Sequence, residues 1–436
     1  MSDHQRLEER ELEHQSKVGN ALYAQSGGVT AVINTSAVGV IETAMQYPHI
    51  FPKIYAGRNG ILGILYEDLF DLTNETEATF AALKMTPGGA FGSCRYKLKS
   101  FEADPEIYQR LFEVFIAHDI RYFFYNGGGD SQDTARKIAE AAPQFGHAIQ
   151  CIGIPKTIDN DLPLTDNSPG FGSVAKYVAV STLEASLDVA SMAATSTKVF
   201  VLEVMGRHAG WIAAAAGLAK QQDGDGPHLI LFPEVVFDPE RFLRAVERCV
   251  SYHGYCVIVV SEGIKNAAGE FVAAQQNQDA FGHQQLGGVG PYVAGIIERE
   301  HGYKLHWAVA DYLQRSARHI ASAVDVEQAY AVGRFGVELA LAGKSAVMPI
   351  IRRKEQPRYG WDLAYVNLSQ VANIEKHMPN EFISEDGFHI TQAAREYLEP
   401  LIQGEAYPHF EQGLPQRVRL VAPMVTKRLS EFNMRE

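Results

Sequence analysis

The sequence predicts an α/β protein of two Rossmann-like lobes with mainly parallel sheets and flanking helices. From Ala21 onward, short β-branched or aromatic runs alternate with longer amphipathic stretches, which is the βαβ order that parallel strands require. The chain has 436 residues, of which 46% are hydrophobic and 21% charged, so it can bury two cores. Polar, glycine-rich segments follow several of these runs, where α/β sheets bind their ligands.

The elements are expected at regular intervals along the first 260 residues. The expected strands are residues 21–24, 121–125, 149–154, 198–204, 229–232 and 256–260. The expected helices are residues 32–45, 105–118, 133–142, 173–190, 209–219 and 239–252. Beyond about residue 345 the pattern is less regular and predicts no defined role.

The N-terminal residues and the apolar stretches indicate where in the cell the protein is expected. Residues 1–19 form a polar N-terminal extension without assigned chemistry, and they lack the apolar core of a secretory signal. Apolar stretches such as residues 212–216 and 257–260 are far shorter than the roughly 20 residues of a spanning helix. We therefore expect no membrane association and a cytoplasmic location.

Charge and cysteine content narrow the classes of partner. The formal net charge is −13 and no long basic stripe offsets it, which disfavours nucleic acid or an anionic membrane as a partner. An anionic substrate would need a local cluster of cations. Four cysteines (Cys94, Cys151, Cys249, Cys256) lack metal-site spacing, so reduced thiols are expected rather than a zinc site or a disulfide framework.

Two glycine-rich loops follow predicted strands. Residues 25–31 (QSGGVTA) precede a helical run, and residues 126–131 (NGGGDS) precede another. Glycines at such turns let backbone N–H groups approach a phosphate at a helix N-terminus, although a tight turn needs glycine for steric reasons alone. Asp130 is either a helix N-cap or a carboxylate that faces Mg²⁺ or phosphate.

The densest group of ionisable residues is the run 155–161 (PKTIDND), again after a strand. Phosphoryl transfer to an alcohol needs a base for the hydroxyl proton, cations for the transferring group and a carboxylate for the metal. One lysine, one threonine and two aspartates could supply much of this. A turn would account for Asp-Asn-Asp but leaves Lys156 unexplained.

Two further strand ends carry charged groups. Residues 203–208 (EVMGRH) close one strand and Glu262 follows another. An arginine can fork onto a phosphate and a carboxylate can accept sugar hydroxyls. Taken singly, each is more often the partner in a surface salt bridge.

The order of these motifs resembles the phosphofructokinase superfamily over residues 21–345. The motifs are residues 26–28 (SGG), 92–95 (GSCR), 127–131 (GGGDS), 156–161 (KTIDND), 205–207 (MGR) and 314–315 (QR). Six motifs in one order are highly specific, whereas the remainder of the chain matches much less clearly. The resemblance implies the phosphofructokinase fold.

The resemblance also implies roles for individual residues. Asp159 corresponds to the base that takes the proton of the sugar's 1-hydroxyl, with Thr157 beside it. The fructose 6-phosphate site would comprise Thr157, Asp161, Met205, Gly206, Arg207, Glu262, Tyr312 and Arg315, with Lys304 as a further phosphate contact. Lys198 lies where the family often places a cation that reaches a neighbouring subunit's site, which implies a homodimer or homotetramer with shared active sites.

Two departures from the ATP-using pattern bear on the phosphoryl donor. Asp130 occupies the second variable place of the Gly-Gly-Asp-Gly-Ser motif, and Lys156 replaces the glycine before Thr-Ile-Asp-Asn-Asp. A carboxylate at Asp130 would repel a nucleotide's α-phosphate, while the Lys156 ammonium can bind the donor directly. The expected diphosphate site is Gly28, Arg95, Asp130 and Lys156, with Lys156 also taking part in catalysis.

The expected reaction is Mg²⁺-dependent, reversible transfer from diphosphate to fructose 6-phosphate, as in glycolysis and gluconeogenesis. Gly129 stands where the family usually has a metal-binding aspartate. Either Asp130 takes part of that role, or Mg²⁺ is held chiefly by diphosphate oxygens and water.

The lobes are expected at residues 20–170 for the donor and 171–312 for the sugar phosphate, with residues 313–436 returning to complete both lobes and form a C-terminal extension. Two alternatives to the expected reaction remain. One is an ATP-dependent 6-phosphofructokinase of the same fold, and the other is a catalytically silent regulatory subunit.

Overall fold

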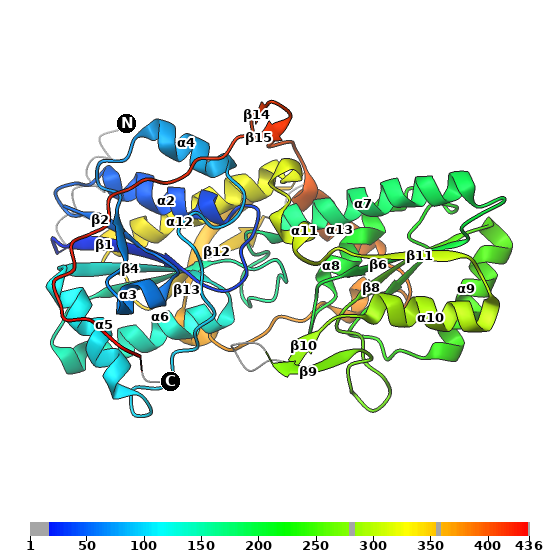
Figure 1. The fold of residues 1–436 in the computed structure, drawn as a ribbon, viewed down its shortest axis with the longest axis horizontal. Coiled ribbons are helices and arrows are strands. Elements are labelled where there is room, and N and C mark those ends of the chain that lie inside the picture. The colour runs from blue at the N-terminus through cyan, green and yellow to red at the C-terminus, as the bar shows by residue number, and fades with distance from the viewer. Residues whose placement is uncertain (1–16, 279–283, 355–358, 435–436) are drawn as a thin grey trace.

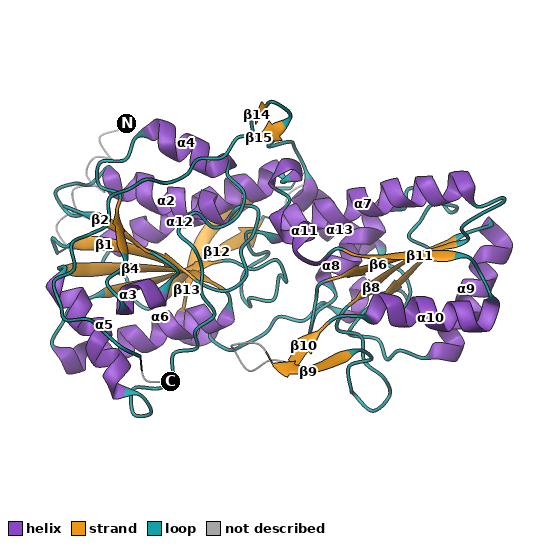
Figure 2. Cartoon of the chain, viewed as in Figure 1, coloured by secondary structure: helices purple, strands orange, loops and turns teal. Residues whose placement is uncertain are grey.

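The chain folds around two sheets that lie side by side along the long axis of the molecule (Figure 1). The computed structural model describes residues 17–278, 284–354 and 359–434. Helices cover both faces of each sheet (Figure 2). This is the layered α/β arrangement in which a parallel sheet is buried on both sides.

The larger sheet has seven strands in the order β13-β12-β5-β4-β1-β2-β3. The strands are β1 (Asn20–Gln25), β2 (Ile54–Gly57), β3 (Leu69–Asp71), β4 (Ile120–Gly127), β5 (Gln150–Pro155), β12 (Val347–Arg353) and β13 (Trp361–Asn367). The five central strands are parallel, and only the edge strands β3 and β13 run antiparallel. The carboxyl ends of β1, β4 and β5 therefore meet at one edge of the sheet.

Two apolar cores fix the helices of this first lobe. One core packs α2 (Ile33–Met45) and α12 (Ala323–Leu341) on one face of the sheet. The other core packs α3 (Ile61–Leu65), α5 (Pro105–Ala117) and α6 (Gly129–Ala141) on the opposite face (Figure 1). Aromatic side chains of β4 alternate between the two cores, because successive residues of a strand point to opposite faces.

Helices α2 and α12 cross at backbone contact distance through a pair of glycines. A Cβ at Gly333 would lie 2.2 Å from the carbonyl oxygen of Ser36, and one at Gly39 would lie 2.3 Å from that of Tyr330. No side chain fits at either position. This contact joins helices almost 300 residues apart in sequence and ties the returning chain to the first lobe.

The second lobe is built on a parallel four-stranded sheet of order β11-β6-β8-β7. Its strands are β6 (Val199–Val204), β7 (Leu229–Leu231), β8 (Cys256–Ser261) and β11 (Leu305–Val309). Helices α7 (Phe171–Met192), α8 (Trp211–Ala216) and α13 (Gln392–Leu398) pack on one face. Helices α9 (Pro239–His253) and α10 (Val289–His301) pack on the other (Figure 1).

Shorter elements complete the chain. These are α4 (Glu77–Met85), α11 (Asp311–Ser316), the hairpin β9 (Ala274–Gln278) with β10 (Gln284–Leu286), and the hairpin β14 (Phe410–Glu411) with β15 (Leu414–Pro415). Short 3-10 helices lie at Ala142–Phe145, Gly217–Ala219, Arg318–Ile320, Leu368–Gln370, Asn380–Phe382 and Glu399–Ile402. After β13 the chain crosses to the second lobe at α13 and returns to the first, where Met424 bridges to Phe70.

The α/β class with mainly parallel strands is confirmed, and each of the twelve expected elements corresponds to an observed one within a few residues. Helices α10 and α12 and the strands after residue 300 were not predicted. The expected N-terminal extension falls mostly on residues outside the described part of the chain. Within the described residues, no helix is both long and apolar enough to cross a membrane. The cytoplasmic location stays a prediction.

Candidate active site

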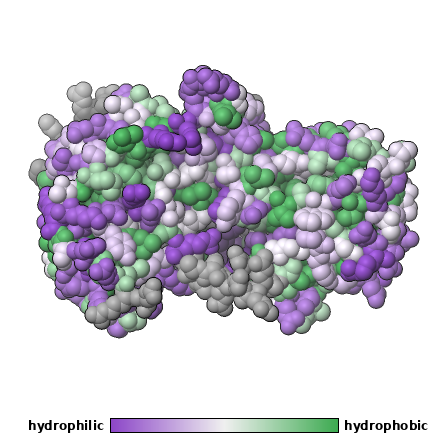
Figure 3. Space-filling model, in the orientation of Figure 1, coloured by the Kyte–Doolittle hydropathy of each residue, from purple (hydrophilic) through white to green (hydrophobic). Residues whose placement is uncertain are grey.

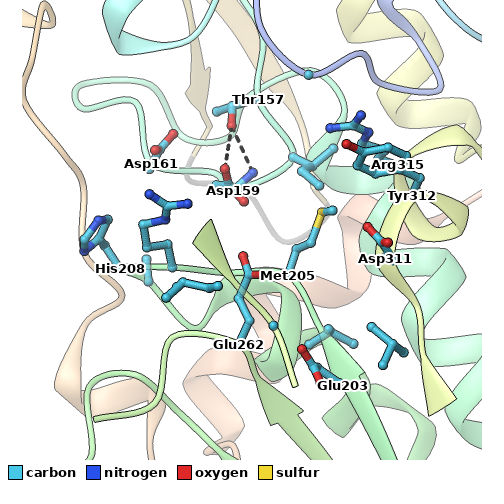
Figure 4. A pocket seen from close by; sticks show the side chains of 18 of the residues that line it. Thr157, Asp159, Asp161, Glu203, Met205, His208, Glu262, Asp311, Tyr312 and Arg315 are labelled. Carbon is cyan, nitrogen blue, oxygen red and sulfur yellow. Dashed lines mark hydrogen bonds between the residues drawn. The ribbon is translucent and has the colours of Figure 1, made fainter. Parts of the chain in front are cut away.

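A cavity of about 680 Å³ lies between the lobes, at the carboxyl ends of strands from both sheets. The residues that follow β1 and β5 line it from the first lobe, and those that end β6 and β8 line it from the second. Parallel strands converge there, so polar residues from distant parts of the sequence meet in one space. Figure 4 shows Asp159 in the middle of this group, with Arg315 and Tyr312 on one side and Asp161 on the other.

The loop after β1 admits two cations because it carries no side chains at two positions. A Cβ at Gly27 (φ +79°) would lie 3.2 Å from Lys156 Nζ, and one at Gly28 would lie 2.6 Å from Arg315 Nη1. Lys156 Nζ donates to the carbonyl oxygen of Gly28 at 2.7 Å. Gly27 and Gly28, where we expected a phosphate to approach the backbone, thus leave room for the positive charges of Lys156 and Arg315 beside the loop.

Lys156 follows the last residue of β5 and is only 5% exposed. Burial lowers the pKa of its ammonium to about 8, although the carboxylates of Asp159 and Asp161 oppose that shift. A lysine in this state is a compact, poorly hydrated positive charge. An anion that enters the cavity would bind this ammonium with little competition from bulk water.

Thr157 holds the backbone of Asp159 in place. The amide of Asp159 donates to Thr157 Oγ1 at 3.0 Å, and the Thr157 hydroxyl lies 3.4 Å from Asp159 Oδ2 (Figure 4). Burial raises the pKa of the Asp159 carboxyl, while Lys156 and Thr157 act in the opposite direction. This setting makes the carboxylate a stronger base than one in water.

Two further carboxyl groups share the cavity. Burial, and then the nearby Asp159 carboxylate, raise the pKa of Asp161 and that of Glu262 to about 7 each. Asp161 Oδ1 is buried without a hydrogen-bond partner among the described residues. Three acidic groups in one buried space cannot all ionise freely near neutral pH unless cations enter or a substrate pairs with them.

The second lobe presents its polar groups on a tightly folded strand end. Ser261 Oγ donates to the carbonyl oxygen of Gly206 at 2.5 Å, and the Gly206 amide lies 3.4 Å from Glu262 Oε1. Gly206 has a φ of +133°, and a Cβ there would lie 2.8 Å from the Ala209 carbonyl oxygen. This turn directs Met205 and Arg207 into the cavity.

Helix α11 supplies the opposite wall. Arg315 Cζ lies 3.9 Å from the ring centroid of Tyr312, which it covers. Burial lowers the pKa of the Arg315 guanidinium, and the positive charge of the neighbouring Arg95 lowers it further. The guanidinium nonetheless remains a cation. With Lys156, Arg95 and Arg207, it forms the local positive cluster that an acidic protein needs for an anionic substrate.

Most of the residues predicted for the site come together, and four do not line the cavity. Those that line it are Gly28, Arg95, Lys156, Thr157, Asp159, Asp161, Met205, Arg207, Glu262, Tyr312 and Arg315. Gly206 contributes through its backbone alone. Asp130 lies in the first turn of α6 and pairs with Lys97 at 3.3 Å.

Lys198 and Lys304 lie at the opposite edge of the second sheet. They precede β6 and β11, and the Lys198 amide donates to the carbonyl oxygen of Lys304 at 2.8 Å. Lys304 Nζ donates to Ser196 Oγ at 2.9 Å, and Lys198 Nζ donates to the Ala193 carbonyl. Within one chain, neither lysine belongs to the cavity.

Sequence reasoning missed several residues that line the cavity, namely Glu203, His208, Asp311 and Glu375. A lone carboxylate inside the apolar run of β6 could have marked Glu203, whose oxygens accept the amides of Gly288 and Gly290 at 3.2 and 2.7 Å. Glu375 comes from the segment after β13, where no sequence pattern predicted a role.

That segment also contacts the run 156–161 from outside the cavity. The Lys376 amide donates to the carbonyl oxygen of Asp161 at 2.6 Å. Lys376 Nζ lies 2.9 Å from the Asp166 carbonyl oxygen, 3.2 Å from that of Thr165 and 3.4 Å from Asn160 Oδ1. Asn160 has a φ of +54°, a conformation that needs such local support. Burial lowers the pKa of Lys376 to about 8.

Comparison with known proteins gives consistent matches. The family described as Phosphofructokinase matches residues 20–340. The chain is 62% identical over 411 residues to the pyrophosphate–fructose 6-phosphate 1-phosphotransferase of Methylococcus capsulatus, covering 94% of this chain and 98% of the relative. It is 56% identical to the enzyme of the same name from Xanthomonas campestris, covering 94% and 98%.

A solved structure shares the fold over nearly the whole chain. The pyrophosphate-dependent phosphofructokinase from Marinobacter aquaeolei superposes with a TM-score of 0.87 at 57% identity, covering 96% of this chain and 100% of that chain. The similarity therefore extends past the family match to the segment after residue 340.

Proposed function

The chain belongs to the phosphofructokinase family, and on that premise we propose that it transfers a phosphoryl group from inorganic diphosphate to the 1-hydroxyl of fructose 6-phosphate. The products are fructose 1,6-bisphosphate and phosphate, and the reaction runs in both directions because donor and product phosphates have similar energies. The observation that carries this proposal is the buried Lys156 ammonium. Lys156 precedes Asp159 by three residues in sequence, and its Nζ donates to the carbonyl oxygen of Gly28 in the loop after β1.

The donor site follows from the cations and the glycine loop. Diphosphate would lie against Gly28 and Arg95. The Lys156 ammonium, which donates to the Gly28 carbonyl oxygen, would then donate to the oxygens of diphosphate instead. Preorganised positive charge stabilises the charge that develops in phosphoryl transfer, and it is most effective where water is excluded. Lys156 is both buried and cationic below a pH of about 8, which satisfies both conditions.

Asp159 acts as the base in this proposal. Its carboxylate lies in the cavity next to the donor cations, and Thr157 fixes its main chain. Removal of the proton from the sugar's 1-hydroxyl as that oxygen attacks phosphorus needs a carboxylate within hydrogen-bond reach. Burial raises the pKa of Asp159, which increases its basicity, while the charges of Lys156 and Arg207 act in the opposite direction and favour the carboxylate.

The sugar phosphate would lie across the second lobe. Arg207 and Arg315 can pair with the 6-phosphate as planar guanidinium forks. Glu262, whose oxygen already lies near the Gly206 amide, can accept sugar hydroxyls. The proposed fructose 6-phosphate residues are Thr157, Asp161, Lys198, Met205, Gly206, Arg207, Glu262, Lys304, Tyr312 and Arg315.

Mg²⁺ is the proposed metal, and Asp130 is the proposed protein ligand. Gly129, which directly precedes Asp130 in the first turn of α6, has no side chain and supplies no second carboxylate. Asp130 is partly exposed and pairs with Lys97 at 3.3 Å, so the remaining ligands would be diphosphate oxygens and water, a donor set that Mg²⁺ accepts. Held chiefly by the oxygens of diphosphate, the ion would neutralise charge on the donor in the cavity, which Asp130 itself does not line.

The proposed division of labour follows the two sheets. Residues 20–170 would bind the donor and residues 171–312 the sugar phosphate, while residues 313–436 return to both lobes. In this division Lys198 and Lys304 serve a neighbouring copy's site, because they lie at the amino ends of β6 and β11 and do not line the cavity of their own chain. We therefore propose a homodimer or homotetramer.

A steady-state comparison of donors tests the proposed activity. Purified protein with Mg²⁺ and fructose 6-phosphate should form fructose 1,6-bisphosphate from diphosphate, with kcat/KM at least about 100-fold above that with ATP, a difference of about 2.7 kcal/mol. The reverse reaction with phosphate should proceed at a comparable rate. Turnover with ATP alone would favour the ATP-dependent alternative, and no turnover with either donor would favour a silent subunit.

A further inference from the structure

A second cluster of reactive side chains lies at the far end of the second lobe. Two thiols, Cys249 and Cys256, and a ring nitrogen of His228 all lie within 4.8 Å of one another, and all three residues are buried. Cys249 belongs to the last turns of α9, Cys256 is the first residue of β8, and His228 directly precedes β7. These are the amino ends of the strands, opposite the cavity, and none of the three lines it.

A backbone hydrogen bond sets the tautomer of His228. The Val257 amide donates to His228 Nδ1 at 3.0 Å, so the neutral ring carries its hydrogen on Nε2. Nε2 is buried and has no hydrogen-bond partner among the described residues. The hydrogen on Nε2 therefore lies close to the two thiols.

The same hydrogen bond disfavours a metal ion. A metal on Nε2 would require the ring hydrogen on Nδ1, where it would face the N–H of Val257. The two thiols with one histidine would also leave a tetrahedral ion one ligand short. The geometry thus favours a ring N–H close to sulfur over a ring nitrogen that ligates a cation.

The two thiols are placed for a reaction with each other. Cys249 Sγ lies 3.2 Å from the carbonyl oxygen of Tyr255, whose peptide leads directly into Cys256. Cys249 is 9% exposed and Cys256 is 0% exposed. The Cys256 thiol, and then His228, hold the pKa of Cys249 below the usual range of a thiol, whereas burial raises that of Cys256. Cys249 is therefore the more reactive and the more accessible thiol.

We propose that Cys249 and Cys256 form a thiol pair that hydrogen peroxide oxidises to a disulfide. The Cys249 thiolate attacks the peroxide, so that an S–O bond forms, the O–O bond breaks and the leaving oxygen departs as water after protonation. The Cys256 sulfur then attacks the resulting sulfenic acid, forming the S–S bond and releasing a second water that carries the Cys256 proton. Two thiols lose two electrons in total, and one peroxide is reduced to two waters.

The remaining cysteines provide internal controls. Cys94 and Cys151 are buried in the first lobe, and burial raises the pKa of each thiol. Both belong to the apolar core of that lobe, and neither belongs to a cluster with another thiol and an imidazole among the described residues. They are expected to resist a hydroperoxide that oxidises the pair.

The test is a count of thiols in the native, full-length protein before and after hydrogen peroxide, with peptide mass spectrometry of the product. We expect loss of two of the four thiols, a mass decrease of about two hydrogens in the peptides that join Cys249 to Cys256, and full recovery with a dithiol reductant. Cys256→Ala should form no intramolecular disulfide, while Cys151→Ala should still lose two thiols.

Three results would overturn the proposal. Retention of all four thiols at peroxide concentrations that oxidise a small exposed thiol would contradict it, as would a disulfide between other cysteines. Purified protein that holds one zinc per chain, and loses it in Cys249→Ala, would assign the cluster to a metal instead. Because the mapping is made on the unaltered chain, a variant that fails to fold does not remove the test.

Discussion

Asp159 is a half-buried carboxylate at which the electrostatic influences of the cavity meet. It is the acid that Lys156, Arg207 and Arg315 all influence, and its own charge raises the pKa of Asp161 and Glu262. Replacing it with alanine should lower kcat by about 1000-fold, within the range for loss of a general base. Diphosphate affinity should change little, because the cations that bind it remain. Steady-state kinetics with a separate binding titration measure both quantities.

Asp223→Ala is the matched control for that variant, because Asp223 is an exposed carboxylate in the loop between α8 and β7. It should leave kcat unchanged. Turnover of Asp159→Ala near that of the parent protein would remove Asp159 from the role of base.

The pH dependence of diphosphate binding reports on Lys156. Its pKa in the free protein is lowered to about 8, so the ammonium is present below that pH and lost above it. The dissociation constant for diphosphate should therefore rise as pH increases through 8, approaching tenfold per unit. Calorimetric titration from pH 6.5 to 9.5 measures this rise.

Diphosphate also titrates over that range, so Lys156→Met serves as the reference. The variant should bind diphosphate more weakly at pH 7 and keep only the pH dependence that belongs to the ligand. Identical profiles for the two proteins would contradict the assignment of Lys156 to the donor.

At this scale the sequence predicted the residues that stand in motifs and missed those that stand alone. Lys156, Thr157 and Asp159 could be proposed because they form a dense run of ionisable groups and because that run resembles a phosphofructokinase motif. Glu375 could not, because it enters the cavity through a long-range return of the chain. For Asp130 the motif predicted a place in the site, but the sequence could not predict that its carboxylate pairs with Lys97 outside the cavity.

At the scale of elements, the crossing of α2 and α12 depends on backbone contact. Gly333→Ala would place a Cβ 2.2 Å from the Ser36 carbonyl oxygen, and overpacking of this kind costs about 1–3 kcal/mol. We expect a lower free energy of unfolding, measured by denaturant titration.

Gly295→Ala is the matched control, because Gly295 also lies inside a helix, α10, but meets only the mobile end of Arg299 at 3.3 Å. Alanine favours a helix over glycine by about 1 kcal/mol, so this variant should be neutral or more stable. Equal effects in the two variants would contradict a tight crossing.

The segment after β13 is a second element that supports the site. Lys376→Met removes the ammonium that lies near Asn160, Thr165 and Asp166. We expect kcat to fall about tenfold, or about 1.4 kcal/mol, because the run 156–161 loses its outer support. Lys427→Met, at an exposed lysine that pairs with Asp68 at 3.0 Å, should leave kcat unchanged.

A fall in the melting temperature of Lys376→Met without a change in kcat would limit Lys376 to stability. Lys376 Nζ donates to the side chain of Asn160 and to the carbonyl oxygens of Thr165 and Asp166. Because Lys376 does not line the cavity, we regard it as a positioning residue. Its KM for both substrates should change less than kcat.

Elements could be predicted where a buried strand and an amphipathic helix alternate closely, as from β4 to α6. They could not be predicted beyond β8. Helix α12 is apolar on most of its surface, because it packs between α2, the sheet and the second lobe, so it lacks the one-sided pattern that marks a surface helix. The antiparallel strand β13 and the segment after it depend on contacts far away in the sequence.

At the scale of the whole molecule, the second lobe carries exposed apolar side chains on β11 and α7. The edge strand β11 exposes Trp307 and Val309, and α7 exposes Leu187 and Met192. Patches of apolar surface are visible on the lobe that carries β11 (Figure 3). An unpaired edge strand with exposed apolar side chains is typical of a surface that another chain covers.

Subunit mixing tests shared sites directly. If Lys198 completes the site of a neighbour, Lys198→Ala and Asp159→Ala are each inactive alone but restore one intact site in a mixed dimer. Equal mixing after reversible dissociation should then recover about one quarter of the parent activity, because half of the dimers are mixed and each has one of two sites intact. No recovery in verified mixed dimers, or full activity of Lys198→Ala alone, would contradict sharing.

The central claim is that Lys156 selects diphosphate as the donor, and a donor exchange tests it most directly. Steady-state kcat/KM for diphosphate and for ATP, each with fructose 6-phosphate and Mg²⁺, should be measured for the parent protein and for Lys156→Gly. We predict that the variant loses at least about 100-fold, or 2.7 kcal/mol, with diphosphate and gains measurable turnover with ATP. Unchanged values with both donors would contradict the claim.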